Sequence, residues 1–335
     1  MVRSARELGW PVLAEPLGGR VGGEVIPHGR LAAMAPQFLA AHPPERILVI
    51  GRLTLSRPMA ALLRTPGVRI ESVTPGPAWP DPGHVVSRVY AWSAWTARRM
   101  AGRSQVRSAA DDRWSAAWRD AGRRLNAAVD AVLTSPDAWP SGPAVAATVL
   151  GAMPAGSVLF AGSSACVRDL DVARADDEID VYAGRGLAGI DGNVATACGL
   201  ALAGRSPTYA LMGDLTFLHD ANALAIGPVE PRPDLSVVVL DDGGGGIFST
   251  LEYGEPGRER FFERMFATPV RSDVLALAAA HGAEVVEAGS REELAAAVAR
   301  PPRGLRVIRV RVERGARRGM EERLRAAAVA ALAVR

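Results

Sequence analysis

The sequence predicts an α/β protein with two domains, of which the second is a doubly wound parallel sheet. The chain has 335 residues, which exceeds the size at which a single hydrophobic core usually stops growing, so two compact units are expected. Short runs of β-branched and other apolar residues alternate with alanine-rich helical stretches, most regularly in the second half of the chain. This alternation is typical of parallel strands covered by helices on both faces.

The first domain, residues 1–135, has a weaker version of this pattern. Its predicted elements are, in order, a strand at 46–51, a helix at 56–64, a strand at 68–73, a proline-rich loop at 74–84 and a helix at 107–133. The segment SPDAWPSGP at 135–143 breaks the last helix and marks the domain boundary.

The second domain, residues 136–335, alternates strands and helices throughout. Six strands are predicted, at 157–162, 179–184, 208–214, 235–242, 283–288 and 305–312. An amphipathic helix at 316–334 closes the chain. Right-handed crossovers between such strands place the intervening helices on both faces of one sheet.

Composition excludes several classes of protein. Hydrophobic residues make up 48% of the chain and charged residues 22%, so a disordered protein is excluded. The basic residues are all arginine, but they are interleaved with acidic residues and the net charge is only +3, which argues against a nucleic-acid partner. No run reaches the roughly 18 apolar residues of a membrane span, so we expect a cytoplasmic protein. Cys166 and Cys198 are expected to be buried thiols rather than a disulfide.

The turns that follow the strands of the second domain carry its candidate chemistry, because ligands of open parallel sheets bind outside the carboxyl ends of the strands. Each turn taken alone has an ordinary explanation, since tight turns need glycine and helix starts need Asp or Ser. The four consecutive glycines Gly243 to Gly246 are harder to explain as a turn, because they cost ordering entropy and remove every side chain that would block a ligand.

A carboxylate and a helix start on the same sheet edge predict a magnesium-bound phosphate. Asp214 directly follows the third strand and precedes a helix start, where free N–H groups attract phosphate. Mg²⁺ is bound by carboxylates, carbonyls, water and substrate phosphates. Asp241 and Asp242 follow Gly213 and Asp214 by fewer than thirty residues, which resembles the diphosphate-binding signature of thiamine diphosphate enzymes.

Longer motifs narrow this resemblance. The segments GRGLAGIDG at 184–192, GDLTFLHDANAL at 213–224 and GGGIF at 244–248 resemble the 2-succinyl-5-enolpyruvyl-6-hydroxy-3-cyclohexene-1-carboxylate synthases of menaquinone biosynthesis, in their actinobacterial form. GWPVLAEP at 9–16 and VIGRLTLSRP at 49–58 resemble the middle domain of the same family. The resemblance implies the thiamine diphosphate-binding fold for residues 136–335, as the family's diphosphate domain, and a smaller middle domain, truncated at its start, for residues 1–135.

The activity that the resemblance implies is a carboligation, a transferase reaction that depends on thiamine diphosphate and Mg²⁺, with Mn²⁺ as an alternative. The cofactor ylide attacks 2-oxoglutarate, carbon dioxide leaves, and the resulting carbanion adds to isochorismate. The thiazolium ring supplies the difficult chemistry, and the protein positions the reactants and supplies charge.

Substrate-binding residues follow from the same resemblance. Both substrates are carboxylates, which arginine binds bidentately. Arg168 and Arg185 fall on family substrate-binding positions, Ser164 on a polar position near them, and Phe248 on an apolar wall of the cavity. Arg57, from the first domain, falls on a basic position of the same cavity, although a solvated arginine at a helix start explains it equally well.

Cofactor and metal residues are implied in the same way. Ile190 matches the bulky aliphatic residue that holds the cofactor bent, whereas an isolated apolar residue would be assigned to core packing. The other implied cofactor contacts are Gly213, Asp214, Gly244, Gly245 and Ile247. The implied metal ligands are Asp214, Asp242 and the backbone carbonyl of Gly245.

The chain departs from the family at one site residue. Gly243 stands where the family has an Asn or Asp side chain on the metal, and glycine offers no side-chain ligand. We therefore expect Asp242 or a further water molecule to complete the metal's coordination shell, and weaker binding of metal and cofactor than with asparagine at this position.

The second departure concerns a whole domain. Family members carry an N-terminal pyrimidine-binding domain whose glutamate activates the cofactor, and the active site forms between that domain and the diphosphate domain of another subunit. Neither Glu15 nor Glu24 aligns with that acid, so no catalytic residue is assigned, and we expect the chain alone to be nearly inactive. It would then be a fragment, one half of a split enzyme, or a non-catalytic remnant, and a homo-oligomer or a separate pyrimidine-binding domain is the expected partner.

Two other functions stay open from the residues. A carboligase of the acetolactate synthase type shares the Gly-Asp signature, but it is not expected to place Arg168 and Arg185 for two polycarboxylate substrates. A non-enzymatic binding module is the alternative from another class, and it is expected to lack magnesium-dependent cofactor binding.

Overall fold

The computed structural model describes residues 5, 8–17, 25–95, 109–173, 178–255 and 257–333, so Glu24 lies outside the described residues. Contacts divide the chain into two units, one made of Met1–Glu15, Val21–Ala128 and Arg325–Arg335, the other of Pro16–Arg20 and Val129–Leu324. The division along the main part of the chain falls inside helix α6 (Ala109–Thr134). The domain boundary expected near residue 135 stays a prediction.

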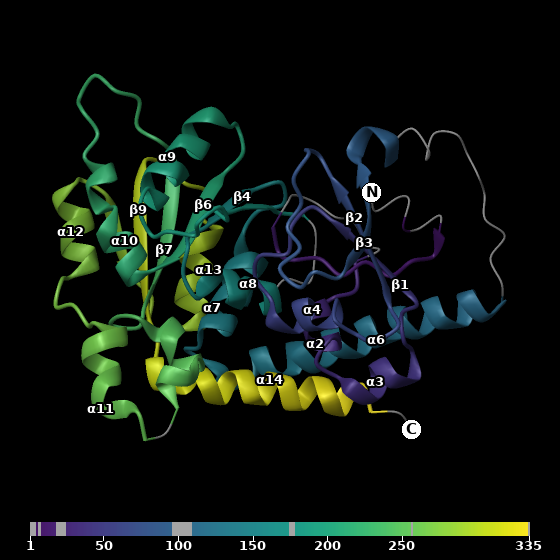
Figure 1. Cartoon of the computed structure of the whole chain (residues 1–335). Coiled ribbons are helices and arrows are strands. Elements are labelled where there is room, and N and C mark those ends of the chain that lie inside the picture. The colour runs from purple at the N-terminus through teal and green to yellow at the C-terminus, as the bar shows by residue number, and fades with distance from the viewer. Residues whose placement is uncertain are drawn as a thin grey trace. The chain divides into compact units, whose positions relative to one another are not determined.

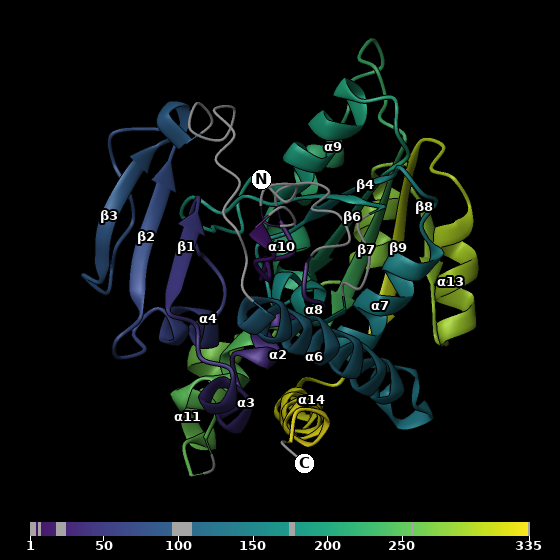
Figure 2. The same cartoon turned by 90° about the vertical axis from the view of Figure 1, so that its right-hand side faces the viewer.

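The first unit contains a three-stranded parallel sheet in the order β1-β2-β3, with β1 at Arg46–Ile50, β2 at Arg69–Thr74 and β3 at Val86–Ala91 (Figure 2). The strands predicted at 46–51 and 68–73 correspond to β1 and β2. Sequence analysis missed β3, which follows the proline-rich loop. Its residues are half-buried or exposed, because β3 is an edge strand, and so its apolar pattern is weak.

The helices of the first unit include α2 (Gly29–Ala32), α3 (Pro36–Ala41), α4 (Arg57–Leu62) and the part of α6 up to Ala128. Helix α4 begins where predicted, because the Ser56 hydroxyl accepts a hydrogen bond from the Met59 N–H at 3.3 Å. The ring of Trp118 on α6 packs edge-on against Phe38 on α3, with 5.0 Å between centroids, and both side chains are buried. A buried aromatic contact of this kind anchors α6 to the short helices.

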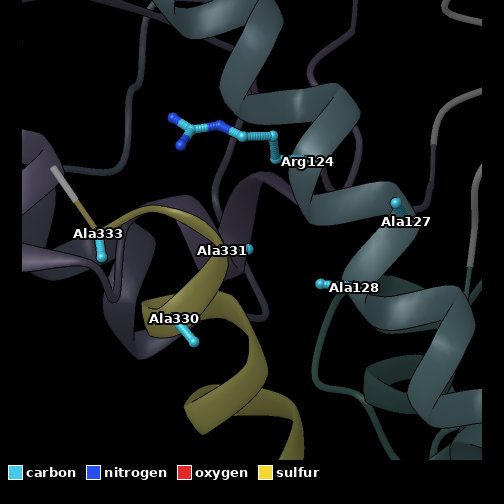
Figure 3. A pocket seen from close by; sticks show the side chains of 6 residues that line it. All are labelled: Arg124, Ala127, Ala128, Ala330, Ala331 and Ala333. Atoms are coloured by element: carbon cyan, nitrogen blue, oxygen red, sulfur yellow. The ribbon is translucent and has the colours of Figure 1, made fainter. Parts of the chain in front are cut away.

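Two further features of the first unit are the contacts of Glu15 and a pocket beside α6. The Glu15 carboxylate accepts hydrogen bonds from the N–H groups of Thr54 and Leu55, at 2.9 and 2.7 Å, so it holds the loop between β1 and α4. A pocket of about 640 Å³ is lined by residues from α6 and from the end of the chain, namely Arg124, Ala127, Ala128, Ala330, Ala331 and Ala333 (Figure 3).

The second unit is built on a six-stranded parallel sheet in the order β5-β4-β6-β7-β9-β8 (Figure 1). The strands are β4 (Val158–Ala161), β5 (Asp180–Tyr182), β6 (Thr208–Gly213), β7 (Leu235–Asp241), β8 (Glu284–Glu287) and β9 (Leu305–Arg311). Every paired register is parallel. All six predicted strands therefore form, and the central ones are almost completely buried.

Helices cover both faces of this sheet. On one face α9 (Asn193–Ala203), α10 (Asp214–His219) and α12 (Val274–Ala280) pack on a core that includes Met212 and Val237. On the other face lie α7 (Gly142–Ala152), α8 (Cys166–Ala173) and α13 (Arg291–Ala299) (Figure 2). Tyr209 precedes Ala210 on β6, and because neighbouring strand residues alternate, its side chain points to the opposite face. There the Tyr209 hydroxyl donates a hydrogen bond to the Val298 carbonyl on α13 at 3.0 Å. The predicted doubly wound α/β fold is confirmed.

The segments between these elements complete the second unit. Short 3-10 helices lie at Gly246–Thr250 (η3) and Glu252–Gly254 (η4), followed by α11 (Glu259–Phe262) and a π-helical turn at Glu263–Ala267 (η5). A 3-10 turn at Arg314–Ala316 (η6) leads into α14 (Arg317–Ala331). None of the helices in the described ranges is long and apolar enough to span a membrane.

Candidate functional site

The candidate site lies at the topological switch point of the six-stranded sheet. The chain runs from β4 to its neighbour β5 on one side and then to β6 on the other side of β4, so the connections diverge at the carboxyl ends of β4 and β6. Such a divergence leaves a crevice where ligands of open sheets bind. The turns that follow these two strands lie against each other, because a Cβ added at Gly213 would stand 3.3 Å from the Ser164 Oγ.

Asp214 is the buried carboxylate of this crevice. It is the first residue of α10, its side chain is 3% exposed, and its Oδ1 accepts a hydrogen bond from the Leu215 N–H at 2.8 Å. Burial raises the pKa of Asp214 to about 7, the nearby carboxylates of Asp242 and Asp241 add to the rise, and the Gly244 N–H opposes it. Asp214 therefore lies beside the glycine turn that follows β7.

Asp242 is the second carboxylate of the site. Its Oδ1 accepts a hydrogen bond from the Gly244 N–H at 3.1 Å. Burial raises the pKa of Asp242 to about 6, and the guanidinium groups of Arg317 and Arg314 act in the opposite direction. The half-buried carboxylate of Asp242 lies near the buried carboxylate of Asp214 and raises its pKa further, so a cation at this point would stabilise the site.

The glycine turn has a structural reason for three of its four glycines. A Cβ at Gly244 would collide with the Ala267 carbonyl oxygen, one at Gly245 with the Phe266 carbonyl oxygen, and one at Gly246 with the Asp242 carboxylate. These glycines therefore permit close approach of the chain to itself. Gly243 differs, because its φ is +70° but no atom lies within 4 Å of an added Cβ.

A polar network that sequence analysis missed joins the turns after β4 and β5. The Asn193 Oδ1 accepts from the Ser163 N–H at 2.9 Å, and its Nδ2 donates to the carbonyls of Gly189 and Asp191 at 3.1 and 3.0 Å. The Thr216 hydroxyl donates to the Ser163 carbonyl at 3.2 Å. Asn193 is 3% exposed, and a buried amide directly after the GRGLAGIDG motif is the signal that could have identified it.

The predicted substrate and cofactor residues of the second unit lie in the segments that follow β4, β5, β6 and β7, at the same sheet edge. Arg168 lies on α8, Arg185 and Ile190 lie in the loop between β5 and α9, and all three are half-buried. Ile247 and Phe248 lie on η3; Phe248 is 36% exposed and its ring centroid is 6.0 Å from that of Phe266.

Arg57 is placed differently, as the first residue of α4 in the first unit, where its side chain is exposed. Its expected position in a substrate cavity stays a prediction.

The donor set fits a metal that is also bound by a diphosphate. Among the described residues no group of three or more His, Cys, Asp or Glu side chains could hold a metal ion. Asp214 and Asp242 form a pair, which suits Mg²⁺ because this ion is usually bound by one or two carboxylates together with substrate phosphates and water. Backbone carbonyls of the glycine turn add neutral oxygen donors.

Comparison with protein families identifies the class of this domain. Residues 170–310 match the family described as "Thiamine pyrophosphate enzyme, C-terminal TPP binding domain". This range includes β5, β6, β7, β8 and most of β9 together with Asp214, Asp242 and the glycine turn. The second unit thus contains a thiamine pyrophosphate-binding domain of the C-terminal type, which confirms the expected fold and cofactor class.

Curated relatives extend the match to nearly the whole chain. The chain is 44% identical over 326 residues to the 2-succinyl-5-enolpyruvyl-6-hydroxy-3-cyclohexene-1-carboxylate synthase of Saccharopolyspora erythraea, covering 97% of this chain and 56% of that protein. It is 42% identical over 340 residues to the synthase of the same name from Kineococcus radiotolerans, covering 98% of this chain and 59% of the relative. The resemblance to these synthases is confirmed, and the chain spans somewhat more than half of their length.

Proposed function

We propose that the second unit binds thiamine diphosphate through a divalent cation at the carboxyl edge of β4, β6 and β7. The observation that carries the proposal is a pair of carboxylates, the buried Asp214 and the half-buried Asp242, at the switch point of a thiamine pyrophosphate-binding domain. A cation bridging these carboxylates to a diphosphate would compensate charge that the protein has buried.

Each residue of the site has a defined part in this proposal. Asp214, Asp242 and the Gly245 carbonyl hold the cation, and the start of α10 and the glycine turn offer N–H groups near the diphosphate. Ile190 and Ile247 pack against the cofactor. When bound, the cofactor supplies the electron sink for decarboxylation and carbon–carbon bond formation.

The reaction belongs to the whole protein, and we propose that it joins decarboxylated 2-oxoglutarate to isochorismate. The names of the relatives support this carboligation. Arg168 and Arg185 would bind substrate carboxylates, with Ser164 donating a hydrogen bond and Phe248 forming an apolar wall. Arg57 is proposed as a third cationic contact.

Calorimetry with thiamine diphosphate tests the cofactor site directly. We expect heat of binding only when Mg²⁺ is present, and we expect Asp214→Asn to abolish it, because the amide carries no charge to neutralise the cation. Asp130→Asn is the matched control, since Asp130 is exposed on α6. Cofactor binding of equal strength with and without Mg²⁺ would contradict the proposal.

Substrate choice is tested with a pyrimidine-binding domain of a relative supplied as a separate polypeptide. We expect consumption of isochorismate only when 2-oxoglutarate is present. Turnover of pyruvate alone would instead indicate a carboligase of the acetolactate synthase type.

A further inference from the structure

Arg314 contacts the glycine turn at the one residue where the metal site lacks a side-chain ligand. Its Nη1 donates to the Gly243 carbonyl at 3.0 Å. A Cβ added at Gly244 would lie 3.2 Å from Arg314 Nη1, and one added at Gly246 would lie 3.3 Å from its Cγ. The arginine side chain therefore extends along the turn and occupies space that side chains at these positions would need.

The other end of the same guanidinium is fixed by an ion pair. Its Nη2 donates to both carboxylate oxygens of Glu263, at 2.8 and 2.6 Å, and the Arg314 side chain is only 20% exposed. Glu263 begins the π-helical turn whose last residue, Ala267, accepts a hydrogen bond from the Gly245 N–H at 2.6 Å. The turn is thus held by Arg314 and also by the π-helical segment that Arg314 binds.

A second arginine, Arg317, lies three residues further along the same segment, where η6 leads into α14. The two arginines differ in surroundings, because Arg317 makes a buried bidentate pair with Asp169, at 3.0 and 2.8 Å. Removing Arg317 would leave a buried carboxylate without its partner, whereas Arg314 pairs with the largely exposed Glu263.

We propose that Arg314 is a positioning residue of the cation site, which holds the Gly243 carbonyl so that the turn presents Asp242 and the Gly245 carbonyl to the metal. The proposal rests on the proposed function of the second unit. A turn with four glycines has a large conformational entropy when free, so an external hydrogen bond at Gly243 lowers the cost of ordering the ligands before the metal binds. Ordering the turn before the metal binds raises the affinity of the site for Mg²⁺ without adding a metal-coordinating atom.

The test compares Mg²⁺ affinity in the presence of saturating thiamine diphosphate for the parent chain, Arg314→Met and Arg300→Met. The methionine variant keeps an apolar side chain over the turn but loses the hydrogen bond to Gly243 and the two hydrogen bonds to Glu263. We expect the apparent Mg²⁺ affinity to fall about tenfold in Arg314→Met, as for the loss of one charge-assisted hydrogen bond. Arg300 also pairs with a glutamate, Glu284 at 2.8 Å, but on the surface near β8, so Arg300→Met is expected to leave the affinity unchanged.

A structural effect is separated from a positioning effect by two further measurements. The first is the urea midpoint of Arg314→Met, which is expected to equal that of the Arg300→Met control. The second is the Mg²⁺ affinity of Glu263→Gln, which keeps the contact between Arg314 and Gly243 possible but loosens the guanidinium. We expect this variant to bind Mg²⁺ two- to fivefold more weakly than the parent chain. If Arg314→Met folds poorly, the Mg²⁺ affinity of Glu263→Gln tests the role of Arg314 in its place. If Glu263→Gln and folded Arg314→Met both bind Mg²⁺ as tightly as the parent chain, the role of Arg314 is overturned but the proposed function is not. If the parent chain shows no magnesium-dependent cofactor binding, the proposed function is overturned as well.

Discussion

Gly243 illustrates how a single residue changes the chemistry expected of the site. Its φ of +70° lies in the left-handed region, yet an added Cβ meets no atom within 4 Å. Asparagine tolerates this backbone region better than most residues. The backbone therefore accommodates the asparagine that the resemblance to the synthases leads us to expect at this position, whose side-chain oxygen glycine lacks.

Restoring that oxygen is expected to strengthen metal binding. Gly243→Asn should raise the apparent Mg²⁺ affinity roughly tenfold, equivalent to about 1.4 kcal/mol, because it adds one neutral oxygen ligand. Calorimetric Mg²⁺ titration in the presence of thiamine diphosphate measures the change. Gly243→Ala is the control, since it adds a Cβ at the same backbone position without an oxygen. Equal affinities for the Asn and Ala variants would show that the position is not at the metal.

The two cysteines provide a prediction that is independent of the cofactor. Burial raises the pKa of Cys166 to about 12 and that of Cys198 to about 11. Raised thiol pKa values keep both side chains neutral at pH 8, with on the order of one thiolate in a thousand or fewer. We expect an aromatic disulfide reagent to label neither cysteine in the folded chain and both in denaturant, as followed by absorbance. Rapid labelling of either thiol at pH 8 without denaturant would contradict this expectation.

At the scale of elements, helix starts are the features that the sequence predicts most directly. Helix α13 begins with a capping box, in which the Ser290 hydroxyl accepts from the Glu293 N–H at 3.1 Å and the Glu293 carboxylate accepts from the Ser290 N–H at 3.3 Å. Both interactions are local in sequence, so they form wherever the helix forms. The edge strand β3 lacks such a local signal.

Loss of the cap on α13 is expected to destabilise the second unit. Ser290→Ala should lower the free energy of unfolding by about 1 kcal/mol, because the Glu293 N–H loses its acceptor at the helix start. Urea denaturation followed by circular dichroism measures the shift in midpoint. Ser206→Ala, at an exposed serine outside any helix, is the control, and a shift of the same size in both variants would argue against a role for the cap.

At the scale of the whole chain, ligand binding is linked to stability. A ligand that binds only the folded state stabilises it by about 2.7 kcal/mol when present at a hundred times its dissociation constant. Thiamine diphosphate with Mg²⁺ should therefore raise the melting temperature of the parent chain in differential scanning calorimetry, while either compound alone should have a smaller effect. The Asp214→Asn variant is expected to show no such rise, and a rise equal to the parent's would place the cation elsewhere.

Local patterns in the sequence were enough to predict the α/β class, the six strands of the second unit and the turns that carry the candidate residues. These features depend on short-range patterns, because strand periodicity, glycine turns and helix caps each involve residues close in the chain. The family motifs likewise lie in contiguous segments, so the thiamine diphosphate domain could be predicted from the sequence alone.

Which of these turns meet, and which contacts hold them, depends on the folded arrangement of the strands. The strand order places the turns after β4, β6 and β7 at one edge, and only the folded chain brings Arg314 and Arg317 to the glycine turn from about seventy residues away. The folded structure also gives a second reason for Gly244, Gly245 and Gly246. A side chain at these positions would collide with the Ala267 carbonyl, the Phe266 carbonyl and the Asp242 carboxylate, respectively. Contacts between residues distant in sequence leave no periodic pattern, because they depend on strand order and crossover connections rather than on neighbouring residues.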